Sequence, residues 1–433
     1  MATISVLANT DAEFETQLSQ LLADRGAGDQ QALAVAAGVI GKIRLEGDRA
    51  LVDYTTQFDR FTVENPLELK ISAERVKQAL QNMDADFRHA LEQAAQRIKD
   101  YHQHQLSESW QFTDSLGNQL GQRITPLERI GVYVPGGKAA YPSTVLMNVI
   151  PAKVAGVENI VMVSPTPDGV VNEVVLGAAA IAGVDEVYAI GGAQAVAALA
   201  IGTESVPKVD KIVGPGNRYV AAAKQLLYGQ VGIDMIAGPS EILIISDAST
   251  DPDWVAMDLF SQAEHDEIAQ VILITADADH LRAVEAAIQK LLPLQARRDI
   301  ISSALRDHGA LIKVDNLEQA VVLANRIAPE HLQLCVDDPD SLLPKIRHAG
   351  AIFVGRYSSE SLGDYCAGPN HVLPTSATAR FSSALGVYDF QKRTSVIRVT
   401  EQGAAELAEI AGVMADAEGL ASHATAARYR RPG

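Results

Sequence analysis

Short apolar runs rich in β-branched residues alternate with helical patterns over most of the chain, and this alternation limits the fold more than any other feature. The runs form a first set at 130–134, 160–163, 187–190 and 211–213, and a second set at 241–246, 271–275, 311–314, 331–336 and 351–354. Alanine-rich segments such as 173–182 and 193–200 separate runs of the first set. Strands joined through helices form parallel βαβ units with both sheet faces covered. We therefore predict an α/β fold with two domains, each containing a partial doubly wound parallel sheet.

The segments outside these sets have a different pattern. Residues 11–110 have the apolar spacing of helices, with candidate helix starts near Asp11 and Ser72. Gly238-Pro239 is the predicted junction between the two sets, and a helical pattern returns after about Ser395. This C-terminal tail is too short for a large core, so we expect it to pack on another domain or another subunit.

Charge and cysteine content restrict the class of protein. The formal net charge of −18 over 433 residues disfavours nucleic acid and anionic membranes as partners. The longest uncharged run, 187–203, is interrupted by Gly191-Gly192 and Gln194, so we interpret it as a strand, a turn and a helix rather than a membrane span. We see no secretory signal, and Cys335 and Cys366 are the only cysteines. We expect a cytoplasmic protein without a disulfide framework.

Three glycine-containing turns follow strands of the first set. They are Gly136-Gly137, Gly191-Gly192 and Gly214-Pro215-Gly216-Asn217. Such turns let a ligand approach the backbone, and the helix N-terminus behind each turn favours anionic groups. None has the Gly-x-Gly-x-x-Gly pattern, and Gly137 stands where a phosphate-binding loop requires lysine. The turns are consistent with a nucleotide cleft and equally with a purely structural use of glycine.

A set of nitrogen and oxygen donors could hold one metal ion. Gln262 and His265 are three residues apart on a predicted helix and would share one face. Asp364 lies in a glycine-containing loop, and either His371 or His423 could supply a further ligand. This mixture of donors suits zinc. The alternative is a solvated acidic helix face, because acidic residues flank His265 on both sides.

A carboxyl group and an imidazole suited to proton transfer are adjacent at Glu330-His331. Pro329 biases its neighbour away from helix, so the pair should lie at a turn that enters a strand. The alternative is an exposed connector between a helix and that strand. Residues 359–371, which include Glu360, crowd polar groups among glycines and are typical of a binding loop.

In this order, these residues resemble the histidinol dehydrogenase family over essentially the whole chain. The motifs that carry the resemblance are Tyr-Val-Pro-Gly-Gly at 133–137, Gly-Pro-Gly-Asn at 214–217, Ala-Gly-Pro-Ser-Glu at 237–241, Ser-Gln-Ala-Glu-His at 261–265, Pro-Glu-His at 329–331, Gly-Asp at 363–364 and Asn-His-Val-Leu-Pro-Thr at 370–375. Several ordered matches make coincidence improbable. The missing glycine fingerprint is no objection, because this family binds NAD without it.

The resemblance implies a zinc-dependent homodimer with two incomplete Rossmann-like domains with parallel sheets, plus small helical terminal segments. An N-terminal helical arm would cover 1–25. A first Rossmann-like domain, over 26–131 and 239–384, would carry the metal and catalytic residues. A second, over 132–238, would bind NAD. A small C-terminal domain over 385–433 would contribute to the site of the partner subunit.

The resemblance also implies roles for individual residues. The catalytic residues would be Glu330 and His331. The ligands of one zinc ion per subunit would be Gln262, His265, Asp364 and His423 of the partner subunit. The substrate contacts would be Ser240, Gln262, His265, His331, Glu360, Asp364, His371, Glu418 and the partner subunit's His423, with Glu360 and Glu418 also reaching across the dimer. The NAD contacts would be Tyr133, Gln194 and Asn217. Taken alone, Glu418 and His423 have the pattern of ordinary surface residues.

The implied reaction is the oxidation of L-histidinol to L-histidine, the last steps of histidine biosynthesis, with two NAD⁺ and a bound histidinaldehyde between the steps. Zinc would orient the substrate through its imidazole and amino nitrogens. His331, neutral at working pH, would take the alcohol proton, and Glu330 would activate the water that hydrates the aldehyde.

Three other interpretations compete with this one. A Cys366 thiolate could form a thiohemiacetal, although a neighbouring carboxylate would raise the pKa of that thiol, and Cys335 lies in an apolar run and looks inert. A zinc hydrolase would activate a metal-bound water, but the sequence lacks His-Glu-x-x-His. A non-catalytic nucleotide- or metal-binding protein would have no use for Glu330 and His331.

Overall fold

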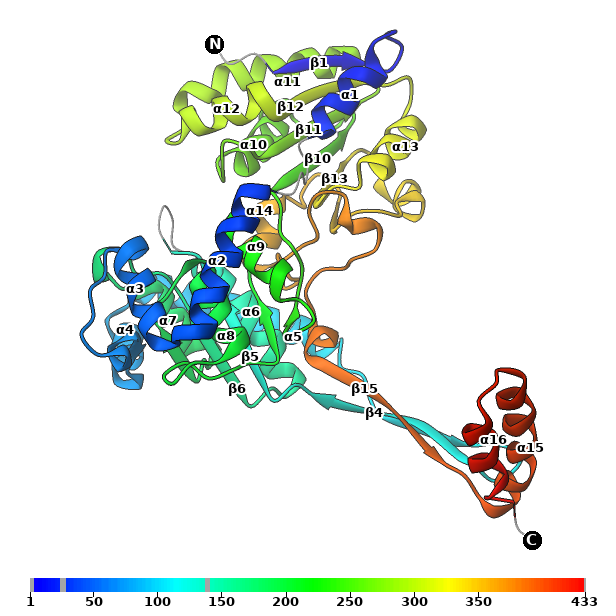
Figure 1. Ribbon diagram of the computed structural model, residues 1–433. Coiled ribbons are helices and arrows are strands. Elements are labelled where there is room, and N and C mark those ends of the chain that lie inside the picture. Colours follow the sequence, from blue (N-terminus) through cyan, green and yellow to red (C-terminus); the bar gives the residue numbers. More distant parts are fainter. Residues whose placement is uncertain (1–3, 24–28, 137–140, 432–433) are drawn as a thin grey trace.

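The computed structural model describes residues 4–23, 29–136 and 141–431, and three β-sheets organise this part of the chain. Figure 1 shows two α/β units, one above the other, and a long arm of strands that ends in a helical hairpin. Gly137, the last residue of one glycine motif, lies outside the described residues, as do residues 1–3 and 24–25 of the expected N-terminal arm.

The first sheet has the order β1-β12-β11-β10-β13-β14, and all its strands are parallel. Its strands are β1 (Ser5–Ala8), β10 (Glu241–Ser246), β11 (Gln270–Thr275), β12 (Gly309–Lys313), β13 (His331–Cys335) and β14 (Ala351–Val354). One face packs on α10 (Pro252–Ala263), α11 (Ala278–Leu291) and α12 (Arg298–His308), and the other on α1 (Phe14–Ala23) and α13 (Leu317–Ile327). Every residue of β10, β11 and β13 is buried, as expected for strands covered on both faces.

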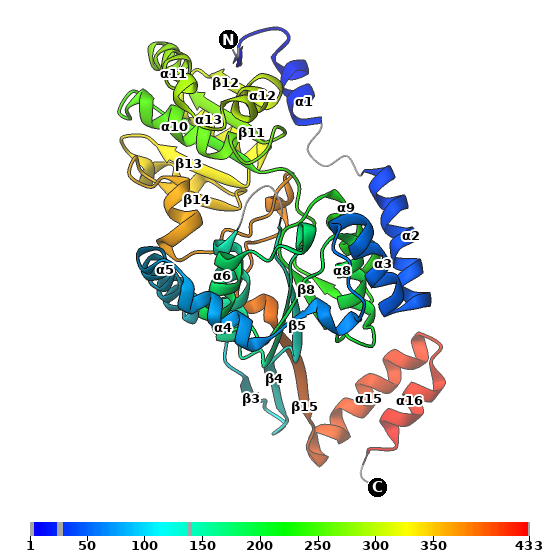
Figure 2. The same cartoon turned by 90° about the vertical axis from the view of Figure 1, so that its left-hand side faces the viewer.

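The second sheet has the order β2-β7-β6-β5-β8-β9 and is parallel except for β2, which pairs antiparallel with β7. Its strands are β2 (Lys70–Ile71), β5 (Arg129–Tyr133), β6 (Asn159–Val163), β7 (Glu186–Tyr188), β8 (Lys211–Val213) and β9 (Gly232–Ile233). One face packs on α4 (Ala73–Asn82), α5 (Ala85–Gln103), α6 (Pro142–Ala155) and α7 (Glu173–Ala182); the other packs on α2 (Gln30–Glu46), α3 (Asp48–Asp59), α8 (Gly192–Ile201) and α9 (Arg218–Leu227). Figure 2 shows the two groups of helices on either side of β5.

The predicted α/β fold class is confirmed, and every strand run predicted from the sequence contains an observed strand. The predicted helix start at Ser72 is also confirmed, because its hydroxyl oxygen accepts the N–H of Arg75 at 3.2 Å. The helix expected near Asp11 begins at Phe14. Gly238-Pro239 lies between the last strand of the second sheet and β10, the first strand of the second predicted set.

The packing of residues 30–103 differs from the expected domain assignment. We expected 26–131 to share a domain with 239–384, but α2 and α3 pack on α8 and α9, and α4 and α5 pack on α6 and α7. These amphipathic helices cover both faces of the second sheet, where their apolar faces are buried. At the N-terminus, β1 pairs with β12, so the expected helical arm contributes a strand to the first sheet. We propose domains that follow the sheets.

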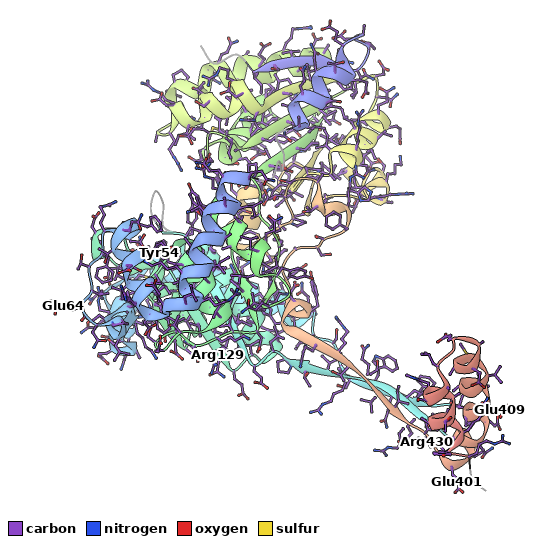
Figure 3. All side chains as sticks on the ribbon, viewed as in Figure 1. Tyr54, Glu64, Arg129, Glu401, Glu409 and Arg430 are labelled. Carbon is purple, nitrogen blue, oxygen red and sulfur yellow. The ribbon has the colours of Figure 1, made fainter. Side chains whose placement is uncertain are left out.

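The long arm that ends in the helical hairpin contains the third sheet, with the antiparallel order β15-β4-β3. It consists of β3 (Trp110–Thr113), β4 (Gln119–Pro126) and β15 (Gln391–Arg398), followed by α15 (Glu401–Ala417) and α16 (Ala421–Arg428). Strand β15 extends to Arg398, beyond the point near Ser395 where we expected helix. Figure 3 shows Glu401, Glu409 and Arg430 on the hairpin, remote from both α/β units.

Shorter elements complete the chain. α14 (Glu360–Leu362) continues directly into a π-helical turn at Gly363–Ala367. Short 3₁₀ turns occur at Pro66–Leu69, Pro167–Gly169, Leu292–Leu294, Pro339–Ser341, Leu343–Lys345, Thr378–Arg380 and Val387–Phe390. Among the described helices, none is both long and apolar enough to cross a bilayer.

Candidate active site

The starts of two neighbouring strands bring the acid–imidazole pair beside Ser240-Glu241. Strands β10 and β13 are parallel, with Ile242 opposite His331, so both begin at the same edge of the first sheet. The expected turn into a strand is present, because Glu330 directly precedes β13. Both Glu330 and His331 are buried, which rules out the alternative of an exposed connector.

The backbone fixes the orientation of the His331 imidazole. Its Nδ1 donates a hydrogen bond to the carbonyl oxygen of Glu241 at 2.9 Å. The basic nitrogen is then Nε2, which lies 3.4 Å from Asp364 Oδ1 and has no hydrogen-bond partner among the described residues. In this tautomer, Nε2 can accept a proton from a hydroxyl group placed beside it.

The charge state of His331 differs from the expectation of a neutral base. Burial lowers the pKa of the imidazole, but the negative charges of Glu330 and Asp364 outweigh that effect and raise the pKa to about 10. The imidazole of the protein alone is therefore protonated at neutral pH. A cation at Asp364 would offset part of the negative charge and favour the neutral form.

The Glu330 carboxyl group lies on the other side of the imidazole. Its Oε2 accepts the backbone N–H of Glu241 at 2.9 Å and lies 3.6 Å from His331 Nδ1. Burial raises the pKa of Glu330 to about 7. A carboxyl group with this pKa can both take and release a proton near neutral pH, as a general acid–base group must.

Two more carboxylates reach the same place from α14 and its π-helical turn. Glu360, Asp364 and His331 each offer a ligand atom, and these atoms lie within 4.8 Å of one another. Glu360 Oε2 also accepts the hydroxyl of Ser261 at 2.9 Å. The π-helical turn places Asp364 toward β13, which illustrates how such turns redirect functional side chains. Glu360 thus lies in the cluster of its own chain, whereas we expected it to reach across a dimer.

The pKa values of these two carboxyl groups are shifted in opposite directions. Burial, aided by the charge of Asp364, raises the pKa of Glu360. Burial would raise the pKa of Asp364 as well, but the neighbouring His331 outweighs it and lowers that pKa. Asp364 is consequently the anion of the pair at neutral pH.

Gln262 and His265 lie at the end of α10, next to Ser261, which binds Glu360, and the charge of Asp364 acts on His265. The helix ends at Ala263, so the histidine lies in the following turn and not on the predicted helix. The His265 N–H still reaches the Gln262 carbonyl at 3.2 Å. Gln262 is fully buried, and neither its side-chain oxygen nor its nitrogen has a hydrogen-bond partner among the described residues.

The two imidazoles nearest the cluster have lowered pKa values. Burial lowers the pKa of His265, opposed by the charge of Asp364. Burial also lowers the pKa of His371, whose Nδ1 lies 2.9 Å from the backbone carbonyl oxygen of Asp364. Both rings are therefore neutral at neutral pH, the state in which an imidazole binds a metal.

The expected cofactor residues gather at the carboxyl ends of strands in the second sheet. Tyr133 ends β5 and its hydroxyl oxygen accepts the N–H of Gly192 at 3.0 Å. Gln194 lies in the first turn of α8 and is buried with an unpaired Nε2. Asn217 caps α9 by accepting the N–H groups of Tyr219 and Val220, so a ligand would meet its amide nitrogen.

A buried ion pair holds the glycine turn after β8. Lys224 Nζ contacts Asp234 and donates to the Gly214 carbonyl at 3.0 Å, while Asp234 Oδ2 accepts the Gly214 N–H at 2.8 Å. Gly214 has φ +105°, and a Cβ there would collide with the carbonyl oxygen of Tyr133. Sequence reasoning missed this pair, because nothing in the spacing of Lys224 and Asp234 indicates a contact.

Glu418 and His423 are remote from the cluster of their own chain. Glu418 follows α15 and His423 lies in α16, both exposed on the hairpin at the far end of the arm (Figure 1). The described chain therefore does not bring them to Asp364.

Neither cysteine has the surroundings of a nucleophile. Both thiols are free. Burial raises the pKa of Cys335 to about 12. Cys366 follows Asp364 in the π-helical turn, but its side chain packs against the apolar core of the second sheet.

The model of the family described as histidinol dehydrogenase matches residues 23–431. The chain is 58% identical over 430 residues to a histidinol dehydrogenase of Dechloromonas aromatica, with 99% of each chain covered. It is 59% identical over 424 residues to one of Chromobacterium violaceum, with 98% of each covered. The crystal structure of histidinol dehydrogenase from Elizabethkingia anophelis superposes with a TM-score of 0.92 at 36% identity, covering 99% of this chain and 98% of that one.

These matches, together with the α/β fold and the buried acid–imidazole cluster, define the class of protein as an oxidoreductase of amino-acid biosynthesis. The family match spans nearly the whole sequence, and the relatives agree on a single name. The chain belongs to the histidinol dehydrogenase family.

Proposed function

We propose that this protein oxidises L-histidinol to L-histidine in two successive NAD-dependent steps, with histidinaldehyde held between them. The observation that carries the proposal is the buried Glu330-His331 pair, with the basic Nε2 of the imidazole directed at Asp364. Two proton acceptors side by side match a reaction that needs one for the alcohol and one for the hydration of the aldehyde. The named relatives support the substrate.

We propose one zinc ion per subunit, held by Gln262, His265 and Asp364 together with His423 of the partner subunit. The unpaired, buried amide of Gln262 supports this fit, because a buried polar group without a partner is costly and a metal would satisfy its oxygen. The neutral form of His265 and the anionic form of Asp364 are the ligating states. When bound, zinc would hold the imidazole and amino nitrogens of the substrate and orient its alcohol carbon.

We propose that NAD binds across the carboxyl ends of β5 and β8, in contact with Tyr133, Gln194 and Asn217. From β5 the strand order proceeds to β6 and β7 on one side, and from β8 it proceeds to β9 on the other; such a switch point is where doubly wound sheets bind nucleotides. The tight turn at Gly214 and the unpaired Nε2 of Gln194 support the fit. When bound, NAD⁺ accepts the hydride in each oxidation.

The residues of this chain move the protons. With a cation at Asp364 favouring the neutral imidazole, Nε2 of His331 would take the proton of the alcohol in the first oxidation, since its Nδ1 is already engaged with the Glu241 carbonyl. Glu330, with a pKa of about 7, then takes a proton from the water that adds to the aldehyde carbon. Ser240, Glu360 and His371 line the same region and would contact the substrate.

We propose a homodimer in which the α15–α16 hairpin of one subunit completes the site of the other with the partner subunit's Glu418 and the partner subunit's His423. The hairpin carries a stripe of exposed apolar side chains on α15, at Leu407, Ile410 and Met414, that a second copy would cover. The charge of −18 and the two free thiols support a cytoplasmic protein without nucleic-acid or membrane partners.

Hybrid dimers test the shared site. Purified Glu330→Gln and His423→Ala variants, each inactive, are mixed under conditions that exchange subunits. Half of the dimers become hybrids with one intact site out of two, so about one quarter of wild-type activity should return. Recovery close to zero, with exchange verified by mass spectrometry, would place all ligands in one chain.

The proposed reaction is tested by its stoichiometry. Limiting L-histidinol is incubated with excess NAD⁺, and NADH is followed by absorbance before chelation, after chelation and after the return of zinc. The proposal requires two NADH for each histidinol, lost with the chelator and restored by zinc. One NADH for each histidinol would mean that the aldehyde escapes, and no NADH would favour a hydrolase or a binding protein.

A further inference from the structure

Glu241 is a carboxylate at the start of an otherwise apolar, fully buried strand. It is 1% exposed, and the five residues that follow it in β10 are apolar except for Ser246. A charged side chain this deeply buried requires strong hydrogen-bonding partners. The proposed mechanism assigns no role to Glu241, yet the residue contacts both catalytic candidates.

The backbone of Glu241 holds the two catalytic side chains. Its N–H donates to Glu330 Oε2 at 2.9 Å, and its carbonyl oxygen accepts from His331 Nδ1 at 2.9 Å. These two bonds fix the position of the carboxyl group and the tautomer of the imidazole at the same time. A shift of this one peptide segment would therefore displace both groups together.

The side chain of Glu241 holds the segments that surround it. Its Oε2 accepts the backbone N–H of Glu330 at 3.3 Å, and its Oε1 accepts the backbone N–H of Ser376 at 3.0 Å. Ser376 has φ +55°, a left-handed conformation that a non-glycine residue adopts only when its surroundings hold it there. The carboxylate thus ties the start of β10 to the start of β13 and to the turn at residue 376.

We propose that Glu241 is a positioning residue, whose carboxylate fixes Glu330 and, through the same strand start, His331, without touching the substrate. This inference rests on the proposed function of Glu330 and His331. Both oxygens of Glu241 act as acceptors, which a carboxylate allows and a glutamine amide does not, since one of its two atoms is a donor. Glutamine would face a backbone N–H with its own NH₂ group, and one of the two segments would lose its partner.

The test compares Glu241→Gln with the wild-type enzyme, as zinc-loaded protein, for histidinol and for histidinaldehyde. A displacement of about 1 Å at the reacting groups lowers rates by about 10- to 100-fold, so kcat should fall by about that factor for both substrates. KM for histidinol and the zinc content should stay within about twofold, because the residue contacts neither. Glu241→Asp, which keeps two acceptor oxygens, should recover part of the loss.

A double variant separates positioning from general destabilisation. If Glu241 acts through Glu330, adding Glu241→Gln to Glu330→Gln should cause little further loss of aldehyde oxidation. The matched control is Gln270→Ala, which removes another buried polar side chain at the same sheet edge, directly opposite Glu241 and bonded to the Leu21 carbonyl. The control should lower the unfolding midpoint and leave kcat within about twofold.

Several outcomes would overturn the inference. The first is a Glu241→Gln enzyme with wild-type kcat. The second is a double variant in which Glu241→Gln slows aldehyde oxidation as much in the Glu330→Gln background as in the wild-type enzyme. The third is a Gln270→Ala control whose kcat falls as much as that of Glu241→Gln. If Glu241→Gln does not fold, Glu241→Asp is measured in both backgrounds against the same criteria. Failure of the proposed function would instead appear as wild-type protein that makes no NADH.

Discussion

The two parallel sheets have the same strand order but present opposite edges to the candidate site. In each, the first strand of the α/β unit lies centrally, the next two follow on one side and the last two on the other: β12-β11-β10-β13-β14 and β7-β6-β5-β8-β9. Each also gains an outer strand from the N-terminal part of the chain, β1 or β2. In the second sheet the proposed site lies at the carboxyl ends of the strands, whereas in the first sheet it lies at the starts of β10 and β13.

The loop at 247–250, which follows β10, closes the carboxyl edge of the first sheet. Beyond β10, Thr250 donates to the Cys335 carbonyl at 2.9 Å, and Asp247 accepts the N–H of Asp337 at 2.9 Å. Arg356 reaches over the same loop to the Ser249 carbonyl at 2.8 Å. The corresponding position in the second sheet has glycine turns instead. Strand order alone therefore does not create a ligand site; the loops at the switch point decide whether one is open.

The largest effect should come from the catalytic edge of the first sheet. His331→Asn removes the proton acceptor and keeps a polar side chain of similar reach, so kcat for histidinol should fall by about 10²- to 10⁴-fold. Initial rates of NADH formation at saturating substrate measure it. His89→Asn, on the exposed surface of α5, is the control and should leave kcat unchanged. A fall below tenfold in the His331 variant would contradict its role as base.

A large loss of stability should come from the cofactor edge of the second sheet. Lys224→Met leaves Asp234 buried without its cation, which should lower the free energy of unfolding by about 3–5 kcal/mol and raise KM for NAD. Urea unfolding and steady-state kinetics measure the two effects. The control is Lys42→Met, which breaks the exposed pair with Asp53 and should leave the urea midpoint nearly unchanged. Equal losses in both variants would mean that the buried pair does not hold this edge.

A smaller effect should come from the closed edge of the first sheet. Thr250→Val keeps the shape of the side chain but removes its hydrogen bond to the Cys335 carbonyl, at a cost of about 1 kcal/mol. KM for NAD and kcat should both remain at wild-type values. A raised KM for NAD would show that this edge takes part in cofactor binding, and the contrast between the sheets would fail.

The smallest effect should come from Cys366. Cys366→Ala removes a thiol that packs on the core of the second sheet, and it should leave both oxidations within about twofold of wild type. The ratio of NADH to histidinol is the measurement. A ratio of one instead of two would revive the thiohemiacetal mechanism.

The sequence predicted the central strands of both sheets because continuous apolar runs mark strands covered on both faces, but it did not predict the outer strands β1 and β9. It did not predict β3, β4 and β15, since these arm strands have no buried residues and β15 pairs with β4 across more than 250 residues. The two-residue strand β2 was also missed. Its identity depends on the partner strand β7 and not on its own residues.

The residues of the candidate site could be predicted from the sequence, but the residues that position them could not. Glu330, His331 and Asp364 were selected from the sequence, and the structure brings them together around one imidazole. The helix bearing Gln262 ends at Ala263, sooner than predicted, and His265 follows in a turn in which its N–H reaches the Gln262 carbonyl. Glu241 carried a usable signal, a charged residue at the head of an apolar run, whereas its bonds to Glu330, His331 and Ser376 arise only from long-range packing.

The contrast between the two sheets is tested most directly by a crystal structure of the zinc-loaded enzyme with NAD and L-histidinol bound. The account predicts NAD at the carboxyl ends of β5 and β8, beside Tyr133, with the substrate at the starts of β10 and β13, beside His331. NAD bound instead at the carboxyl ends of β10 and β13, with the loop at 247–250 displaced, would contradict it.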